Sequence, residues 1–475
     1  MNKRLIIILV AVAAMAVAGV IAFLTLRGGN DAYLAMIPKD ARGIVKIDLR
    51  SIIKRSGITS DQLQTVMQRL AKDDATDVTT AGIDLSKPLV GFVSPSSLFG
   101  IAGKVDDEDA LVKALAKGGA DGVQQQRGYS WMLLKSNYLV AFNADKVLCM
   151  GPAVGAAQDQ LRNEMYRYLE QDKKASGIES AYYDYVSSSN APGAALLPLS
   201  LMPESLRKSV SQYIPASVVN DVSVALTFDL GKHDMHIATE LRTDNQEAKA
   251  KIGSFETLFR TIDARFADSS LENTFAWCCM NVDGQQLLDM LRSIPSLRLA
   301  LIGVSMMVDI EQMIRAVDGD VVINVGQAPQ EGKDKVQLLL TAQVGNTDFL
   351  KKADYWVNSS RLNLVQRLSE TDFCLKMSGS PVWFGVDDDV LYFSSIKDTH
   401  HGSGNAFVTS QKSEIKGARI FATFDFAKAG AYDKDVQQYA DVCRSITLSM
   451  RDLGAFRLNI EGEPDKNLLF DILMK

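Results

Sequence analysis

The sequence predicts an α+β protein: an N-terminal transmembrane helix followed by two tandem copies of an antiparallel-rich sheet with helices packed on one face. Three observations lead to this prediction. An uncharged apolar run occupies residues 5–26. Short apolar segments with alternating or continuous hydrophobicity, several of them joined by polar turns, indicate strands and hairpins. Helical patterns lie between these strands, and the order of the segments in the first half of the chain recurs in the second half.

The apolar run LIIILVAVAAMAVAGVIAFLTL predicts a membrane anchor. At about 1.5 Å per residue, a helix over residues 5–26 spans roughly 33 Å, which is enough to cross the hydrocarbon core. Lys3 and Arg4 precede the run. They place residues 1–4 in the cytoplasm and the remaining chain, beginning with a linker at 27–31, in the periplasm of a single-pass inner-membrane protein. The alternative is a signal peptide cleaved near AVAG, and we favour the anchor because cleavage there leaves an apolar N-terminus.

The chain beyond the linker divides into two α+β copies, residues 32–268 and residues 269–475. Each copy begins with an apolar strand that ends in an aspartate, Asp48 in the first and Asp283 in the second, and continues into an amphipathic helix. A strand with a following helix and then an apolar hairpin occur in both copies, at 99–117 and 138–151 and again at 338–353 and 381–395. A polar helix at 159–174 has no counterpart in the second copy. The repetition therefore predicts an internal duplication.

The two aspartates at these junctions raise the question of a catalytic carboxylate pair. An aspartate directly before a helix accepts a hydrogen bond from one of the unpaired N–H groups of the first turn. Gln286, three residues after Asp283, completes a capping box. A weaker strand-to-helix junction in each copy offers a serine in the first and an aspartate in the second, and serine can cap a helix but cannot act as a carboxylate base. We therefore interpret all four residues as structural helix caps: Asp48, Ser200, Asp283 and Asp425.

Composition and motifs argue against several classes of function. The net charge of −6 and the pI of about 5.5 argue against a basic nucleic-acid surface. The odd number of cysteines, most of them within apolar runs, indicates small buried side chains and not a disulfide framework. Ser51 and Lys54 match the S-x-x-K spacing without its companion motifs, and the four histidines do not show metal-ligand spacing. We therefore expect no catalytic residues, no metal and no cofactor, although an enzyme whose site lacks a short motif remains an alternative.

One segment carries a resemblance to a known family. The stretch AYLAMIPKDARGIVKIDLRSIIKRSGI, at residues 32–58, directly follows the apolar run. It resembles the start of an uncharacterised Bacteroidota family of exported, membrane-anchored envelope proteins that is known only as a domain of unknown function. The resemblance implies a cell-envelope location and supplies no catalytic residues. Many relatives look like lipoproteins with an N-terminal cysteine, which this chain lacks near residue 26.

These observations predict a membrane-tethered periplasmic binding or scaffold protein of unknown ligand. Its expected partners are the inner membrane, through residues 5–26, and another envelope protein. The alternatives are an envelope hydrolase without a motif and a carrier of an apolar or lipid ligand. The Met- and Leu-rich segment at 301–314 is either the wall of such a carrier or plain core.

The helix added to the first copy is the candidate partner surface, because tyrosine supplies a large contact area with a polar tip. The other interpretation is that its tyrosines pack the added helix onto the sheet. The candidate residues are Met165, Tyr166, Tyr168, Tyr182, Tyr183 and Tyr185.

Overall fold

The structure is a computed structural model. It describes residues 32–59, 61–63, 65–66, 82–135, 137–202, 204, 207, 217–305, 307–327, 336–359, 364–376, 381–397, 399–431 and 433–474. The predicted membrane run at 5–26, with residues 1–4 and the linker at 27–31, lies outside these ranges. None of the helices in these ranges combines the length and the apolar character needed to cross a bilayer.

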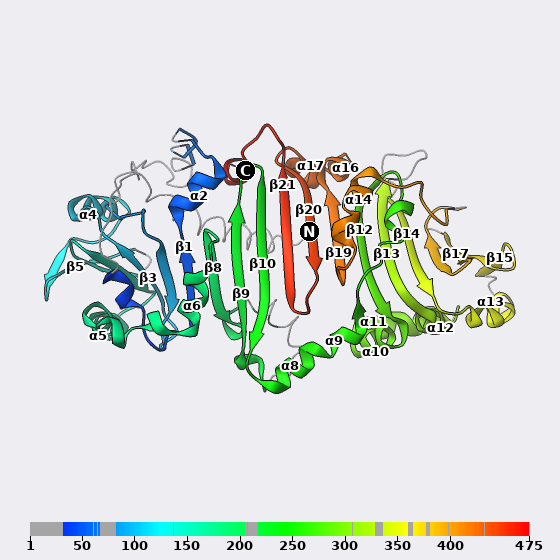
Figure 1. Cartoon of the computed structure of the whole chain (residues 1–475), viewed down its shortest axis with the longest axis horizontal. Helices are drawn as coiled ribbons and strands as arrows, with labels where there is room; N and C mark the ends of the chain where they lie inside the picture. The colour runs from blue at the N-terminus through cyan, green and yellow to red at the C-terminus, as the bar shows by residue number, and fades with distance from the viewer. Residues whose placement is uncertain are drawn as a thin grey trace. The chain divides into compact units, whose positions relative to one another are not determined.

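The chain forms two compact units, residues 1–248 with 462–475 and residues 249–461 (Figure 1). The sequence places a copy boundary at 268/269 and assigns the C-terminal end to the second copy. This division into copies stays a prediction, and by its contacts the C-terminal end belongs to unit 1. Its helix α18 (Leu468–Leu473) is held there by two hydrogen bonds, from Asn467 Nδ2 to the Ser56 carbonyl at 2.7 Å and from the Leu468 amide to the Lys232 carbonyl at 3.0 Å.

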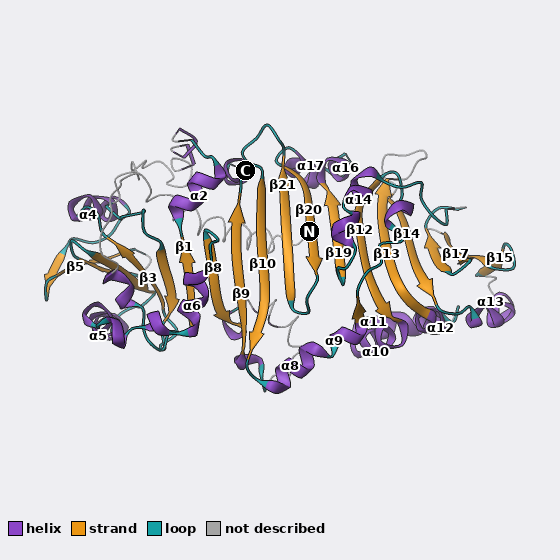
Figure 2. Cartoon of the chain, viewed as in Figure 1, coloured by secondary structure: helices purple, strands orange, loops and turns teal. Residues whose placement is uncertain are grey.

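Unit 1 contains an antiparallel sheet whose described strands pair in the order β4-β5-β6-β7-β3-β2-β1-β8-β9-β10 (Figure 2). The strands are β1 (Gly43–Ile47), β2 (Leu89–Val93), β3 (Phe99–Lys104), β4 (Gln124–Gln126), β5 (Tyr129–Leu133), β6 (Leu139–Phe142), β7 (Lys146–Gly151), β8 (Gly193–Pro198), β9 (Val222–Leu230) and β10 (Asp234–Thr243). The helices that matter below are α2 (Leu49–Ser56), α4 (Glu108–Lys117), α5 (Ala157–Glu170) and α6 (Ala181–Ser188).

Unit 2 contains a sheet with the strand order β15-β16-β17-β18-β14-β13-β12-β19-β20, again antiparallel, and β11 pairs with the end of β12. The strands are β11 (Phe259–Arg260), β12 (Thr274–Asp283), β13 (Val317–Gln327), β14 (Val336–Val344), β15 (Val365–Arg367), β16 (Asp372–Lys376), β17 (Pro381–Asp387), β18 (Val390–Ser394), β19 (Ile420–Asp425) and β20 (Cys443–Met450), followed by β21 (Ala455–Gly462). When the strands are matched in chain order, from β1 with β12 to β9 with β20, the two sheets have the same strand order.

The helices of unit 2 occupy the connections between its strands. They are α9 (Phe255–Leu258), α10 (Gly284–Ser293), α11 (Pro295–Ser305), α12 (Ile310–Ala316), the 3₁₀ helix η8 (Asp348–Lys352), α13 (Ala353–Ser359), α14 (Ala406–Ser410), α15 (Lys412–Ile415), α16 (Phe426–Gly430) and α17 (Lys434–Ala440). Helix α8 (Gln246–Gly253) spans the boundary between the two units.

The α+β prediction with an antiparallel-rich sheet is confirmed, but the prediction that helices pack on one face is wrong. In β6, Leu139 and Ala141 belong to the core beneath α5, whereas Val140 and Phe142 belong to the core beneath α4. Because successive side chains of a strand point to opposite faces, α4 and α5 cover opposite faces of this sheet.

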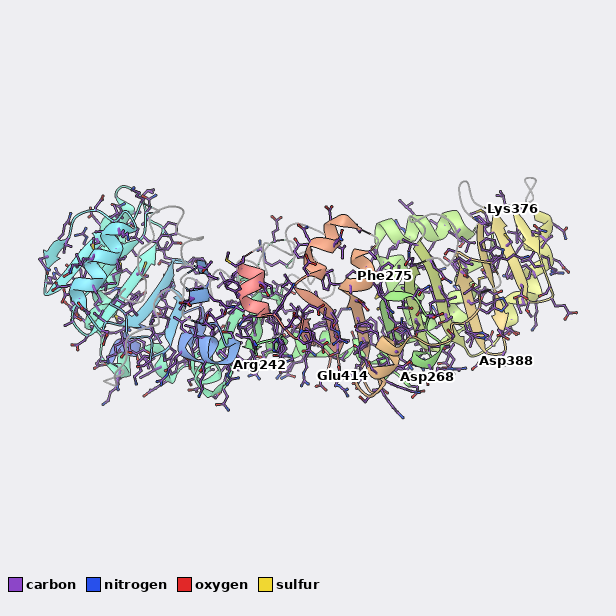
Figure 3. The ribbon with its side chains drawn as sticks, turned by 90° about the horizontal axis from the view of Figure 1, so that it is seen from above. Arg242, Asp268, Phe275, Lys376, Asp388 and Glu414 are labelled. Atoms are coloured by element: carbon purple, nitrogen blue, oxygen red, sulfur yellow. The ribbon has the colours of Figure 1, made fainter. Side chains whose placement is uncertain are left out.

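Unit 2 follows the same rule. Helices α12 and α13 share a core with β16 and β17, and α14 and α15 share another with β12 and β19. Figure 3 shows Glu414 of α15 on the opposite side of unit 2 from Phe275. Strands buried on both faces lose the polar–apolar alternation that would reveal a single covered face, which is why the sequence pattern is misleading here.

Candidate functional site

The tyrosine-rich segment of unit 1 is mostly core. Met165, Tyr166 and Tyr168 of α5 are buried in the main hydrophobic cluster of the unit. Tyr166 packs against Trp131 with ring centroids 4.8 Å apart. The three α5 side chains therefore pack the added helix onto the sheet and do not form the predicted partner surface. The other three candidates, on α6, are half-buried against the same cluster: Tyr182, Tyr183 and Tyr185.

Three of the four predicted cap residues lie at helix N-caps. Asp48 accepts a hydrogen bond from the Ser51 amide at 2.9 Å, and Asp283 and Asp425 make the same contact at the starts of α10 and α16. Ser200 differs, because it lies inside a short 3₁₀ helix (Leu199–Leu201) whose N-cap position is Pro198. A proline side chain has no acceptor, and this helix has no side-chain cap.

Substitution at Asp48 tests the structural role directly. Asp48→Ala is expected to lower the free energy of unfolding by about 1 kcal/mol, because the Ser51 amide loses its acceptor. Asp48→Asn should retain most of the stability, because an asparagine side chain also caps. Chemical denaturation of the two variants measures the difference. Equal losses for both would mean that the carboxylate charge, and not the cap, stabilises this junction.

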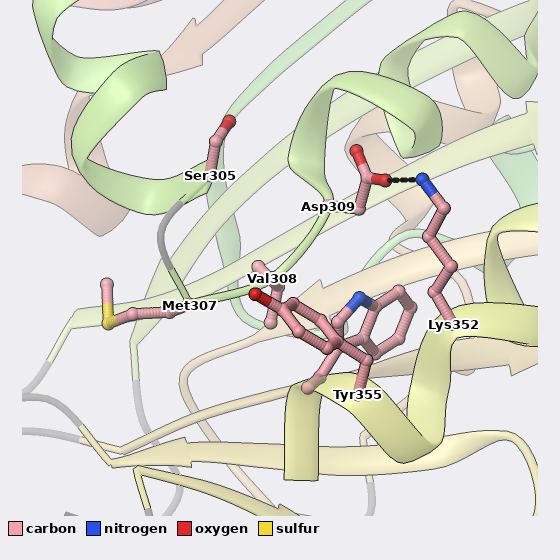
Figure 4. Close-up of a pocket in the computed structure, with 7 residues that line it drawn as sticks. Ser305, Met307, Val308, Asp309, Lys352 and Tyr355 are labelled. Carbon is pink, nitrogen blue, oxygen red and sulfur yellow. Dashed lines mark hydrogen bonds and ion pairs between the residues drawn. The ribbon is translucent and has the colours of Figure 1, made fainter. Parts of the chain in front are cut away.

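A half-open cavity lies in unit 2. It has a volume of about 380 Å³. Its walls come from the connection between α11 and α12 and from η8 and α13 (Figure 4). The lining residues are Ser305, Met307, Val308, Asp309, Lys352, Tyr355 and Trp356. This volume lies in the range of pockets that bind small molecules.

One aromatic residue of the cavity is buried in the core and its neighbour is exposed. Trp356 is 1% exposed and packs edge-on against Phe373 at 5.4 Å between centroids, within the core of the unit. Tyr355, the neighbouring residue on α13, is 70% exposed. Successive helix residues point about 100° apart, so one aromatic ring anchors α13 while the other extends toward solvent.

Two charged side chains lie at the cavity. Lys352 Nζ and Asp309 Oδ2 form an ion pair at 2.5 Å (Figure 4). The other oxygen of Asp309 accepts the Gln312 amide at 3.3 Å, which caps α12. The lysine side chain is about half exposed, whereas the aspartate is partly covered. The Lys352 ammonium group can therefore pair with another anion, while the hydrogen bond from the Gln312 amide holds Asp309 at the start of α12.

The helix that leads into the cavity has an unusual surface. Among the side chains of α11 that the structure describes, none is buried. Leu299 and Ile302 are 67% and 51% exposed, and Leu297 is also exposed. Leu299 and Ile302 are three residues apart and therefore lie on the same face of the helix, and exposed apolar residues grouped on one face mark a binding surface.

Strand β13 carries a buried carboxylate, that of Asp320. Asp320 is fully buried, and its carboxylate accepts Asn281 Nδ2 at 2.9 Å, the Asp263 amide at 3.2 Å and the Ala264 amide at 3.0 Å. Ala264 has a φ of +64°, an unfavourable conformation for alanine that these bonds hold in place. Burial raises the pKa of Asp320, and the three hydrogen bonds oppose that rise. These bonds join β13 to Asn281 of β12 and to the main chain at 263–264, and we therefore interpret Asp320 as a structural residue.

The cysteines and histidines do not come together. All five cysteines are free thiols, and burial raises the pKa of Cys149 to about 12. His233 Nδ1 lies 2.8 Å from the Lys466 carbonyl in unit 1, whereas His400 stacks on Tyr392 in unit 2. Over the ranges that the structure describes, no three His, Cys, Asp or Glu side chains are grouped closely enough to hold a metal ion.

The sequence pointed to only half of the cavity site. The segment at 301–314 stood out as rich in Met and Leu, with core and carrier wall as its two explanations. Tyr355 and Trp356 lie on α13, which follows this segment in the sequence only after two strands, β13 and β14. Their proximity to the α11–α12 connection depends on tertiary packing that no local pattern encodes.

Comparison with known proteins gives a family but no activity. No curated protein matches the chain. Two solved structures that resemble it are crystal form III of TP0453, with a TM-score of 0.29, 10% identity and coverage of 48% of this chain and 87% of that one, and crystal form I of TP0453, with a TM-score of 0.27, 8% identity and coverage of 46% and 80%. These TM-scores are too low to support an argument about fold or function.

A family model of a domain of unknown function, DUF4836, matches residues 33–454. The match covers nearly all of the chain beyond the apolar run. It includes residues 33–58 of the segment that carries the family resemblance, and the whole of the cavity site. The chain therefore belongs to this family, DUF4836.

Proposed function

We propose that this protein is a membrane-tethered periplasmic binding protein without catalytic activity, and that it binds an amphiphile with an acyl chain in unit 2. The observation that carries the proposal is the exposed apolar helix α11 beside an aromatic-walled cavity. An exposed leucine or isoleucine forgoes stabilisation of about 1.5–3 kcal/mol relative to a buried one. Several on one short helix indicate a surface that is covered when the protein works.

The apolar part of the ligand would lie along Met307 and Val308 and against the ring of Tyr355. Figure 4 shows Val308 next to the ring of Tyr355, with the Met307 side chain extending away from that ring. Methionine adapts to irregular apolar ligands because it is unbranched and flexible. The exposed face of α11 extends this apolar surface beyond the cavity, so a chain longer than the cavity still finds contact.

The polar head would lie at the ion pair. Lys352 is the cationic residue in the lining, and a carboxylate or phosphate head could exchange with Asp309 for its ammonium group. Because Asp309 also caps α12, it keeps one partner after the exchange. The Trp356 side chain is buried in the hydrophobic core of the unit and supplies an apolar wall behind the cavity.

The tether and the location rest on the sequence alone. The apolar run at 5–26, preceded by Lys3 and Arg4, supports a single-pass anchor in the inner membrane with both units in the periplasm. The shared strand order of the two units supports an internal duplication. A scaffold for another envelope protein and a hydrolase without a motif are the competing functions.

Quenching of tryptophan fluorescence by a brominated fatty acid tests the proposal. The full chain is kept in a non-ionic amphipol, which forms no free micelles that would take up the probe. We expect saturable quenching that Trp356→Phe reduces, since bromine quenches an indole only at close range. The double variant Leu299→Ser, Ile302→Ser should weaken binding by about tenfold or more, because it removes apolar surface that the acyl chain would cover.

Leu368→Ser is the matched control, because Leu368 is an exposed leucine of unit 2 outside the proposed surface. It should bind the probe as the unmodified chain does. Quenching that is linear in probe, or that falls equally in the control and the double variant, would contradict an amphiphile site at α11.

A further inference from the structure

The outer end of the unit 1 sheet presents two arginines over a pair of aromatic rings. The Arg162 guanidinium lies 5.2 Å from the ring centroid of Trp131, and that of Arg127 lies 4.6 Å from the ring centroid of Tyr166. The two rings are themselves in contact. Helix α5 thus buries its tyrosines, whereas its Arg162 is half-buried.

These arginines lack carboxylate partners among the described residues. Arg162 Nη1 donates to Gln126 Oε1 at 3.1 Å, while its Nε is buried without an acceptor. A guanidinium has five N–H donors, and its preferred partner is a carboxylate held by two parallel bonds. Elsewhere in the described chain, pairs such as Arg55 with Asp229 and Arg265 with Asp389 satisfy that preference. Stacking on an aromatic ring orients the Arg162 fork and leaves its remaining donors available.

The strand beside Arg162 is the edge of the sheet. β4 (Gln124–Gln126) pairs with β5 on one side, and all three of its residues are exposed. The hairpin that joins them has a two-residue turn, Arg127 and Gly128, with φ values of +51° and +78°. In such a hairpin the residues flanking the turn are hydrogen-bonded to each other, so the main-chain groups of Gln126 and Gln124 face β5. Those of Gln125 face away from the sheet.

We propose that β4 and the Arg162–Arg127 pair form a docking site for an extended acidic peptide of a partner protein. The peptide adds a strand to the sheet by hydrogen bonds with the Gln125 N–H and C=O groups. Neighbouring strands lie about 4.8 Å apart, so a side chain opposite Gln126 on the added strand reaches the Arg162 guanidinium. Glutamate there forms the ion pair that the arginine lacks. This site is separate from the amphiphile cavity and does not depend on it.

Binding of a fluorescein-labelled peptide of alternating threonine and glutamate, followed by fluorescence anisotropy, tests this proposal with the full chain in non-ionic amphipol. The same peptide with glutamine in place of glutamate is the neutral probe. We expect the acidic peptide to bind at least tenfold more tightly, and more weakly as salt is raised. Arg162→Gln should remove most of that preference.

Two matched pairs of variants separate the charge from the edge. Arg167→Gln removes another arginine of α5, whose guanidinium lies over the ring of Tyr168 and not over the Trp131–Tyr166 pair. This variant should bind the acidic peptide with an affinity within about twofold of that of the unmodified chain. Gln125→Pro removes the outward N–H and should abolish binding, whereas Gln125→Ala keeps that N–H and should bind. Equal affinity for the acidic and neutral peptides, or binding that survives Gln125→Pro, would overturn the proposal.

Discussion

Asp320→Ala is expected to lower the free energy of unfolding by about 3 kcal/mol, one of the largest effects of any single substitution in unit 2. The alanine removes the acceptor of three N–H groups, two of them main-chain amides, and leaves these donors at a position shielded from solvent. An unsatisfied buried donor costs about 1–3 kcal/mol, and the relief of burying a carboxylate offsets part of the sum. Urea denaturation monitored by circular dichroism measures the change.

The pH dependence of the Asp320 contribution has a definite sign. Because burial raises the pKa of Asp320 in the folded chain, the unfolded chain loses this proton first as the pH rises. The contribution of Asp320 to stability is therefore fully present below about pH 4 and declines as the pH rises through its folded pKa. Asp320→Asn does not titrate. The stability advantage of the natural chain over this variant should be largest near pH 4 and shrink toward pH 7, and a gap that widens instead would contradict the assignment.

Trp356→Ala is expected to cost about 3–5 kcal/mol of stability, because it opens a cavity between α13 and the sheet. The indole packs against Phe373 and Phe384, whose centroids lie 5.4 and 6.2 Å away. Thermal or chemical unfolding of the full chain, compared with the unmodified protein, measures the loss.

Trp356→Phe isolates the apolar contribution. The indole N–H has no partner among the described residues, so its removal forfeits no hydrogen bond, and phenylalanine preserves most of the ring contact. We expect this variant to cost less than half as much as the alanine variant. Equal costs would show that the indole N–H is bonded in solution and that the wall of the cavity is not apolar at that point.

Local patterns predicted the parts of this fold that depend on neighbouring residues. Asp48 and Asp283 were recognisable as caps because a strand, an acceptor and an amphipathic turn follow one another in the sequence. Strand and hairpin patterns led to the antiparallel α+β class for the same reason. The prediction for Ser200 was wrong because the sequence pattern did not specify the residue at which the helix begins. The short 3₁₀ helix begins at Leu199, so Ser200 lies inside it.

Properties that depend on tertiary packing were not predictable. The tyrosines of α5 look like a contact surface in sequence because tyrosine is common at interfaces, yet the sheet beneath them buries Tyr166 and Tyr168. The α11 segment looks like core because it is apolar, yet no described element covers Leu299 or Ile302. Burial is set by which elements pack together, and periodicity does not specify that. The hydrogen bonds between Asp320 and the amides of residues 263 and 264 join parts of the chain that are far apart in sequence, and no sequence motif predicts them.

The proposed function depends above all on an acyl chain that binds along α11 and into the adjacent cavity. Photo-crosslinking of the full chain in non-ionic amphipol with a diazirine-bearing fatty acid, followed by peptide mass spectrometry to locate the adducts, tests this binding mode. We expect adducts on residues 297–309 and 352–356, competed away by the unlabelled fatty acid. Phe99 and Ile101 of β3 are similarly exposed apolar residues of unit 1 and provide the internal comparison. Adducts that concentrate on β3, or that resist competition, would contradict an acyl-chain site at α11.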